Sequence, residues 1–219
     1  MHDVKTKARV QEYWNRNSCG EVMAVGANLE DGITTAARRR YQLEPYIYGF
    51  ADFPSGRERD VLEIGVGMGA DHKEWAKHRP RLLAGIDLTP RAIDFTARSL
   101  SMDGLTSLLQ VSDAENLPFR DNMFDIVYSW GVLHHSPDTP AAVREVWRVL
   151  KPGGKAAVMI YHRWSIVGFM LWGRYAMMAG KPWRSLTEIY AEHLESPGTK
   201  AYASAEAAAM FADFAKVEV

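Results

Sequence analysis

Cysteine is nearly absent from this chain, in which Cys19 is the one thiol among 219 residues. No disulfide can form within the chain and no thiolate metal site can be built from a single thiol, which excludes a disulfide-stapled miniprotein. Net charge is also close to zero, with 26 Lys and Arg residues against 27 Asp and Glu residues. The overall charge therefore gives no electrostatic reason to expect nucleic acid or an anionic membrane as a partner.

Long hydrophobic runs are missing as well. The longest apolar segment, 164–180, is slightly shorter than a membrane-spanning helix, and Arg174 interrupts it. Residues 1–14 are polar and lack the apolar centre of a secretory signal. Hydrophobic residues still make up 47% of the chain, which is enough for a folded core and excludes a disordered protein. We therefore expect a cytoplasmic protein with no stable membrane insertion.

From residue 60 onward, short apolar segments alternate with helical segments. Strands are expected at 61–64, 82–87, 105–111, 124–129 and 155–161. Alternation at this spacing indicates βαβ units, because parallel strands need a crossover helix between them. The sequence predicts an α/β fold: a doubly wound, mostly parallel, Rossmann-like sheet with helices on both faces.

A glycine-rich turn follows the first expected strand. Gly65, Gly67 and Gly69 stand between that strand and a helix, where glycine lets the backbone turn tightly and lets a ligand lie against it. With Ala70 in the last position, the same segment also fits the dinucleotide fingerprint of an NAD(P)-dependent oxidoreductase. A tight turn without any ligand is the remaining alternative.

Acidic residues collect where the expected strands end. These residues are Glu63, Asp71, Asp87, Asp113 and Glu115, and no Lys or Arg is expected beside them. Carboxylates repel a pyrophosphate, whereas they suit a cofactor that carries a cationic sulfonium, an ammonium group and a ribose diol. The carboxyl edge of the sheet therefore favours S-adenosylmethionine over a dinucleotide.

Four segments, in order, resemble the class I S-adenosylmethionine-dependent methyltransferases of the small-molecule and quinone-biosynthesis type. They are VLEIGVGMGAD (61–71), GIDLTPRAI (85–93), SDAENLPFRDNMFDIVYSWGVLHHSPD (112–138) and LKPGGKAAV (150–158). The resemblance covers residues 60–161 and implies an enzyme that transfers a methyl group to an O, N or C atom of a small, partly apolar molecule. An NAD(P)-dependent oxidoreductase and a catalytically inactive binding module of the same fold stay as alternatives.

The resemblance also implies where S-adenosylmethionine and its product, S-adenosylhomocysteine, bind. The methionine part is assigned to Glu63 and the glycine turn, the ribose to Asp87, and the adenine amine to Asp113. Trp130 is assigned to the border between the methyl group and the acceptor. The complete set of implied cofactor residues is Glu63, Gly65, Gly67, Gly69, Asp87, Leu88, Asp113, Ala114, Glu115, Ser129 and Trp130.

Three histidines are candidates for a general base. Methyl transfer from a sulfonium depends mainly on alignment of the reactants, and a base is needed only where the acceptor has to lose a proton. His134 and His135 follow the fourth expected strand and His162 follows the fifth, and imidazole suits proton removal near neutral pH. Local packing is the alternative role for each of them. No metal is expected.

The chain is expected to form one domain in four parts. Residues 1–59 are an N-terminal helical extension, residues 60–162 the cofactor-binding core, residues 163–203 a helical insertion, and residues 204–219 the last helix and the start of a terminal strand. The insertion is too long for a connecting loop and is rich in Trp and Met, so we expect it to cover the acceptor pocket as a lid. A core or dimer-forming helix is the first alternative. A helix that touches lipid is the other, and it is disfavoured because its polar face is not basic.

Domains of the resembling family normally end with an antiparallel strand, which this sequence lacks. The expected sheet therefore keeps an exposed edge, and such edges are usually covered. We expect a homodimer that covers this edge, and a small-molecule acceptor as the other partner.

Overall fold

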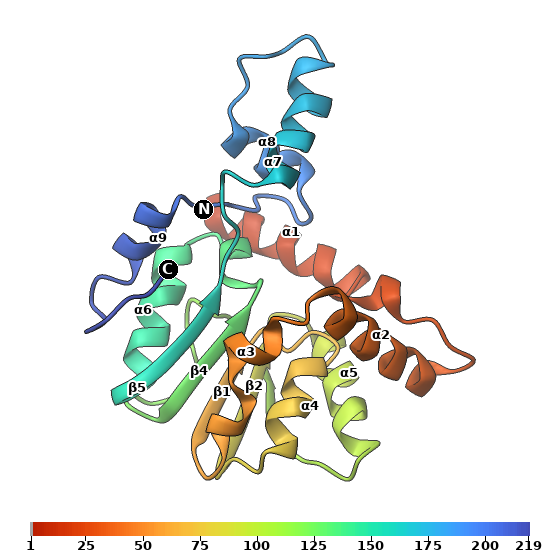
Figure 1. The fold of residues 1–219 in the computed structure, drawn as a ribbon, viewed down its shortest axis with the longest axis vertical. Helices are drawn as coiled ribbons and strands as arrows, with labels where there is room; N and C mark the ends of the chain where they lie inside the picture. Colours follow the sequence, from red (N-terminus) through yellow and green to blue (C-terminus); the bar gives the residue numbers. More distant parts are fainter. Residues whose placement is uncertain (1) are drawn as a thin grey trace.

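A five-stranded sheet forms the centre of the computed structural model, which describes residues 2–219 (Figure 1). Its strands lie in the order β3-β2-β1-β4-β5, and every neighbouring pair runs parallel. The strands are β1 (Asp60–Ile64), β2 (Leu82–Asp87), β3 (Leu108–Val111), β4 (Phe124–Trp130) and β5 (Leu150–Met159). The parallel Rossmann-like sheet predicted from the sequence is confirmed.

Helices cover both faces of this sheet, because successive residues of a strand point to opposite sides. On one face Leu62 of β1 packs with Val146 of α6, and on the other face Val61 packs with Trp75 of α4. Figure 1 shows α6 and α9 on one side of the sheet and α4 and α5 on the other. These helices are α4 (Ala70–Lys77), α5 (Pro90–Ser101), α6 (Thr139–Val149) and α9 (Ser204–Met210).

The N-terminal extension crosses the carboxyl edge of the sheet. Gln11 of α1 donates a hydrogen bond from Nε2 to the carbonyl oxygen of Leu88, 2.9 Å away, directly after β2. Figure 1 shows α1 and α2 lying across this edge. The extension consists of α1 (His2–Arg16), η1 (Glu21–Met23), α2 (Leu29–Leu43), α3 (Ile47–Ala51) and η2 (Phe53–Gly56).

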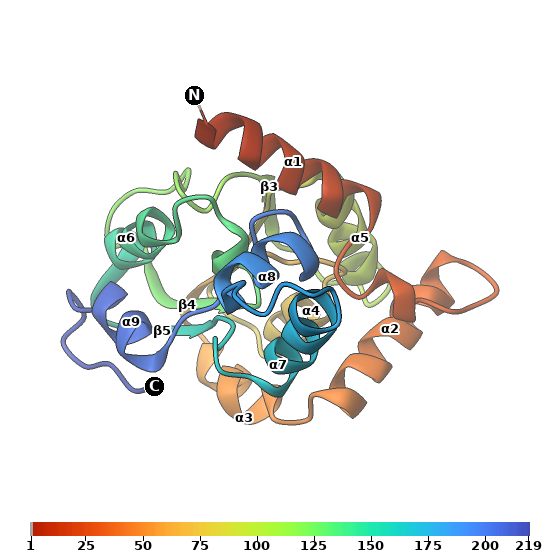
Figure 2. The same cartoon turned by 90° about the horizontal axis from the view of Figure 1, so that it is seen from above.

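The insertion stands above the same edge as a small helical unit with its own core of Leu186, Tyr190 and Ala201. Seen from above, α7 and α8 lie over the middle of the molecule (Figure 2). Within residues 2–219, no helix combines the length and the apolar character that crossing a bilayer requires. The elements between β4 and α9, besides α6 and β5, are η3 (Leu133–His135), α7 (Ile166–Trp172), the π-helix η4 (Gly173–Met177) and α8 (Leu186–His193).

The expected start of a terminal strand at 216–219 is wrong. These residues have no regular structure and pair with no strand of the described chain. After α9 the chain turns back, since Phe211 and Phe214 pack against the α6 side of the core and Asp213 accepts a hydrogen bond from Trp147 Nε1. β5 therefore remains an edge strand of the sheet.

Two strand boundaries also differ from expectation. β3 begins at Leu108 rather than at residue 105. β5 begins at Leu150 and includes Pro152–Gly154, which the sequence placed in a turn before the strand. An irregular register between Phe124 and Ile126 of β4 accommodates these extra residues, so the turn became part of a bulged strand.

Asp71 in the first turn of α4 joins the N-terminal extension to the sheet. Its side chain is only 4% exposed. It accepts hydrogen bonds from Arg40 Nη2 at 2.6 Å and from Tyr41 OH at 2.9 Å, both on α2, and from Tyr128 OH on β4 at 2.8 Å. A buried carboxylate needs such partners, because an unpaired charge in the interior is strongly unfavourable. Asp71 therefore fixes α2 over the sheet edge.

We expect Asp71→Asn to lower the free energy of unfolding by about 3 kcal/mol, because it leaves the largely buried Arg40 with only the longer contact to Glu44, at 3.4 Å. The measurement is urea unfolding followed by far-UV circular dichroism. Asp94→Asn is the matched control, since Asp94 forms an exposed ion pair with Arg98 within α5 and its loss is expected to cost less than about 0.5 kcal/mol. Equal effects of the two substitutions would contradict the role given to Asp71.

Candidate functional site

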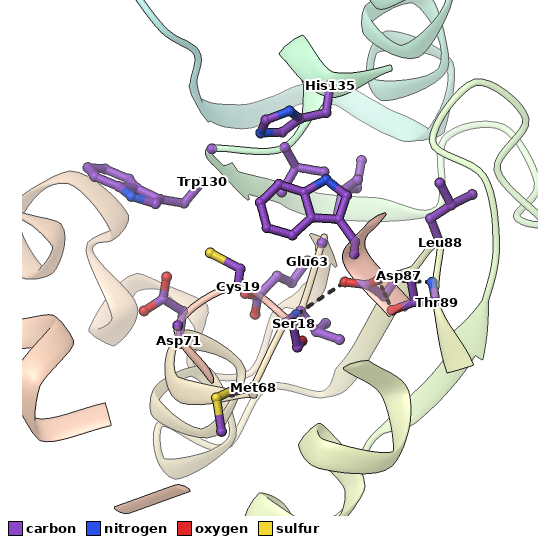
Figure 3. A pocket seen from close by; sticks show the side chains of 18 of the residues that line it. Ser18, Cys19, Glu63, Met68, Asp71, Asp87, Leu88, Thr89, Trp130 and His135 are labelled. Carbon is purple, nitrogen blue, oxygen red and sulfur yellow. Dashed lines mark hydrogen bonds between the residues drawn. The ribbon is translucent and has the colours of Figure 1, made fainter. Parts of the chain in front are cut away.

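A cavity of about 380 Å³ lies between the carboxyl edge of the sheet and the N-terminal extension. The ends of β1, β2, β4 and β5 form its floor, α1 and α2 form its cover, and Glu195 reaches it from the insertion. Figure 3 shows Trp130 and Leu88 on opposite sides of this space. The predicted cofactor residues on its lining are Glu63, Gly65, Gly67, Asp87, Leu88, Asp113, Ala114 and Trp130.

The three other predicted cofactor residues do not line the cavity. Ser129 is fully buried and donates a hydrogen bond to the carbonyl oxygen of Ile64 at 3.1 Å. Gly69 faces α5, where a Cβ atom would lie 2.9 Å from the Cα atom of Thr96. Glu115 accepts a hydrogen bond from the backbone N–H of Asp138 at 2.9 Å. Each of these positions supports a neighbouring element of the fold.

The glycine turn presents bare backbone to the cavity. Gly65 has φ +83°, and a Cβ atom there would lie 2.1 Å from Val132 Cγ2, so no side chain fits. Gly67 has φ +52°, and the nearest atom to a Cβ atom there is the Cys19 carbonyl oxygen at 3.8 Å, an ordinary van der Waals distance, so nothing crowds the backbone at this position. A ligand can therefore lie directly against the backbone at Gly67.

Asp87 ends β2 with its carboxylate held beside this turn. Its Oδ2 accepts from the backbone N–H of Gly67 at 3.2 Å, and its Oδ1 accepts from both the N–H and the hydroxyl of Thr89 at 3.0 Å (Figure 3). Burial raises the pKa of Asp87 despite these donors. Each carboxylate oxygen has further lone pairs, so Asp87 can also accept from a vicinal diol.

Glu63 forms a buried chain with His72 and Ser107. Ser107 Oγ donates its proton to the carbonyl oxygen of Leu83 at 2.9 Å, so at 2.7 Å it accepts from His72 Nε2. The neutral ring then offers an unprotonated Nδ1 to Glu63 Oε2 at 3.0 Å, which requires a proton on Glu63. Burial accordingly raises the pKa of Glu63 well above its usual value and lowers the pKa of His72 to about 3.

The expectation that no Lys or Arg lies beside the acidic edge is wrong. Lys7 of α1 binds both Asp113 and Glu115, and Arg40 of α2 binds Asp71. Burial by itself would raise the pKa of Glu115, but hydrogen bonds such as that from Lys7 lower it. The sequence carries no sign of these pairs, because partners more than thirty residues apart meet only after folding.

The lining nevertheless stays acidic. Its Lys and Arg residues, Lys7 and Arg40, are both engaged by carboxylates. The carboxyl groups on the lining are those of Glu44, Glu63, Asp71, Asp87, Asp113 and Glu195. A cationic ligand is therefore favoured here over a pyrophosphate, as the sequence predicts.

Glu195 is a site residue that the sequence reasoning missed. Tyr161 OH lies 3.0 Å from both of its carboxylate oxygens, and His135 Nε2 lies 3.2 Å from Oε2. Burial opposes ionisation, yet these partners lower the pKa of Glu195 overall. Glu195 has φ +53°, a backbone conformation that side chains rarely adopt. No motif marks this position in the sequence.

The three candidate bases lie in different surroundings. His135 lines the cavity and packs edge-on against Trp14 of α1, with 5.0 Å between ring centroids. His134 is fully buried, and its ring lies over Tyr161 with 3.9 Å between centroids. His162 is exposed and outside the lining. Of the three, only His135 has access to a ligand in this cavity.

Cys19 also reaches the cavity (Figure 3). Burial raises the pKa of its thiol to about 11. The thiol is therefore protonated at neutral pH and is a poor nucleophile. Its part in the site is that of a small apolar contact.

One group among the described residues has the spacing of metal ligands. Side-chain atoms of His134, His135 and Glu195 all lie within 4.8 Å of one another. Burial, His135 and then the Lys200 ammonium lower the pKa of His134, so a cation already lies near this group. The Glu195 carboxylate already accepts a hydrogen bond from Tyr161 OH and contacts His135 Nε2. We therefore assign no metal to it.

The aromatic part of the insertion does not form a wall of the cavity, contrary to expectation. No residue of 164–180 lies on the lining, to which the insertion contributes Glu195 alone. Trp164, Phe169 and Met170 are more than half exposed instead. The reason is that α7 packs on α8, whose Tyr190 hydroxyl would lie 1.9 Å from a Cβ atom at Gly168.

Comparison with known proteins gives the family. Residues 62–158 match the model of the methyltransferase domain. The chain is 30% identical over 148 residues to 2-methyl-6-phytyl-1,4-hydroquinone methyltransferase of Synechocystis, covering 63% of this chain and 45% of that protein. Residues 62–158 are a methyltransferase domain.

The chain is also similar to a second curated methyltransferase and to a protein of solved structure. Phosphoethanolamine N-methyltransferase 2 of Caenorhabditis elegans is 32% identical over 51% of this chain and 25% of its own length. The YcgJ protein of Bacillus subtilis has a solved structure that matches with a TM-score of 0.58 and 26% identity, over 74% of this chain and 65% of that one. The chain spans less than half the length of the two curated relatives.

These findings confirm the class I S-adenosylmethionine-dependent methyltransferase type, and they lend no support to an oxidoreductase. The cofactor of this domain type is S-adenosylmethionine, and the cavity fits it. Gly67 offers bare backbone, Asp87 offers acceptors to a ribose diol, and Glu63 offers a carboxyl group to an ammonium. The contacts of individual residues with the cofactor stay predictions.

We expect Asp87→Ala to weaken S-adenosylhomocysteine binding by about 1–3 kcal/mol, the usual effect of losing hydrogen bonds to a charged group. Isothermal titration calorimetry measures the affinity. Asp94→Ala, on the solvent side of α5, is the control and is expected to bind like the parent. Unchanged affinity in Asp87→Ala would remove the ribose role from this residue.

We expect the affinity for S-adenosylhomocysteine to rise with pH below the raised pKa of Glu63, as long as the ligand amine stays charged. The empty protein holds a proton on Glu63 because burial raises its pKa, and an ammonium partner requires the carboxylate, so binding releases that proton. Calorimetry at several pH values measures the slope. Glu63→Gln should flatten it, and a flat profile in the parent protein would refute the protonated state.

Proposed function

We propose that this chain is an S-adenosylmethionine-dependent methyltransferase that methylates an O, N or C atom of a small, partly apolar molecule. The observation that carries this proposal is the cavity, which joins an open glycine turn and the Asp87 carboxylate to a wall of aromatic residues. Trp130 on that wall packs with Phe50 of α3, with 5.1 Å between ring centroids. An apolar acceptor thus has a surface to lie on beside the cofactor.

The charges on the cavity lining disfavour an acceptor that carries a phosphate. Arg40 and Lys7 are both paired, so neither is available to a phosphate. A phosphate-bearing acceptor, as in the name of the Caenorhabditis elegans relative, would meet Glu44 and Glu195 instead. Carboxylates favour a neutral or cationic acceptor, such as a phenol, a quinol or an amine.

When bound, the cofactor supplies an activated methyl group on a cationic sulfur. The protein aligns the acceptor with that methyl group, which can supply much of the rate. An acceptor that carries a proton must also lose it, and Glu195 with His135 is the group on the cavity wall that can take it. Tyr161 holds the Glu195 carboxylate in place through its hydroxyl.

Turnover tests this proposal. The protein is incubated with methyl-labelled S-adenosylmethionine and a panel of phenols, quinols and amines, and label transfer to at least one of them is expected. Thermal unfolding with S-adenosylhomocysteine and with NAD is measured in parallel, because a ligand of the folded state raises the midpoint. Stabilisation by NAD alone would overturn the proposal. Stabilisation by S-adenosylhomocysteine without any transfer would favour the inactive binding module.

We expect Glu195→Gln to lower kcat by about 10²–10⁴-fold on a protic acceptor, the usual contribution of general acid–base catalysis. Cofactor affinity should stay unchanged, because Asp87 and the glycine turn are untouched. Glu192→Gln is the matched control, since Glu192 lies three residues earlier, on α8, where it pairs with Arg184. A parental kcat in Glu195→Gln would exclude this carboxylate from proton transfer.

A further inference from the structure

The outer surface of the insertion is apolar although it faces solvent. Ile166 of α7 is 81% exposed and Met170, one turn later, is 69% exposed. Met178 and Trp183, in the segment that follows η4, are 85% and 78% exposed. Figure 1 shows this part of the chain projecting away from the sheet. Several strongly exposed apolar side chains within one short segment are typical of an interaction site, because folded proteins seldom expose many of them together.

The charges within this segment are all positive. Between residues 163 and 187 the sequence contains Arg163, Arg174, Lys181 and Arg184, and it contains no Asp or Glu. Arg163 and Arg184 pair with carboxylates of α9 and α8. Arg174 and Lys181 are exposed, and neither forms an ion pair with a carboxylate of the described chain. We call Ile166, Met170, Arg174, Met178, Lys181 and Trp183 the insertion surface.

A second copy of this chain is a poor occupant of the insertion surface. A two-fold dimer pairs a patch with itself, which would place Arg174 and Lys181 against the same cations of the second copy, and residues 163–187 contain no carboxylate to compensate them. Like charges placed opposite each other in an interface are unfavourable. The partner that complements this surface is anionic and also has an apolar layer behind its charges.

We propose that the insertion surface binds the face of an anionic lipid bilayer. Arg174 and Lys181 meet the lipid phosphates, while Ile166, Met170 and Met178 enter the boundary of the acyl chains. Trp183 lies at the headgroup level, where indole rings are favoured. The helices lie on the bilayer without crossing it. This inference goes beyond the proposed methyl transfer and does not depend on it.

The insertion surface and the cavity residue Glu195 belong to the same part of the chain. The insertion that carries this surface also carries Glu195 to the cavity wall. Tyr190 of α8 ties its helices together, since its hydroxyl donates to the carbonyl oxygen of Arg163 at 2.9 Å. The insertion surface therefore belongs to the same helical unit as Glu195, and α7 and α8 of that unit lie over the middle of the molecule when it is seen from above (Figure 2).

Vesicle sedimentation of the full chain tests this inference. We expect the protein to pellet with vesicles of phosphatidylcholine and phosphatidylglycerol, and at least about tenfold less with phosphatidylcholine alone. Added salt should weaken the interaction, since it screens the headgroup charge. Failure to pellet with the anionic vesicles at low salt would overturn the proposal.

Four variants separate the contributions. Ile166→Asp combined with Met178→Asp, and separately Arg174→Glu combined with Lys181→Glu, should each lower binding at least about tenfold. The controls are Val22→Asp, an exposed apolar position on η1, and Arg120→Glu, an exposed cation near β4, and both should bind like the parent.

Two further measurements accompany these variants. Binding of S-adenosylhomocysteine shows that each variant is folded, because the insertion surface lies outside the cofactor cavity. Sedimentation velocity without lipid tests for a dimer. A parental dimer that dissociates in the Ile166→Asp and Met178→Asp variant would overturn the proposal in favour of a second copy, and equal losses in the control variants would also overturn it.

Discussion

The contact between cations of the N-terminal helices and carboxylates at the sheet edge organises this molecule. Arg40 reaches the buried Asp71, and Lys7 reaches Asp113 and Glu115. A parallel sheet gathers carboxylates at one edge and leaves them uncompensated, and α1 and α2 supply the missing charge. Because these helices are held by charge across that edge, they form the cover of the cavity rather than packing on a sheet face.

The cavity that results carries two kinds of carboxyl group. Three donors, two backbone N–H groups and the Thr89 hydroxyl, favour the carboxylate of Asp87, although burial raises its pKa overall. Glu63, with a neutral His72 as its partner, carries a proton. The empty site is therefore less negative than its number of carboxyl groups indicates. A bound cation favours the ionised form of Glu63, so its binding displaces the proton and adds a negative charge to the site. The site suits a sulfonium cofactor with an ammonium group.

The insertion has two sides with separate roles. Its inner end brings Glu195 to His135 and Tyr161 on the cavity wall, where a proton acceptor is useful for methyl transfer. Its outer side exposes Ile166, Met178 and unpaired cations. The expected homodimer across the edge of β5 stays a prediction, whereas the lid of aromatic residues does not hold, because α7 faces away from the cavity.

The sheet, the glycine turn and Asp87 could be predicted from the sequence, because they depend on local periodicity and on a motif whose residues are neighbours in the chain. It also placed Trp130 and His135 correctly on the cavity. Folding in three dimensions was needed to show which groups meet across long separations: Lys7 with Asp113, Arg40 with Asp71, and Glu195 with His135. Such pairs follow from how helices dock on a sheet, and no spacing in the sequence encodes that docking.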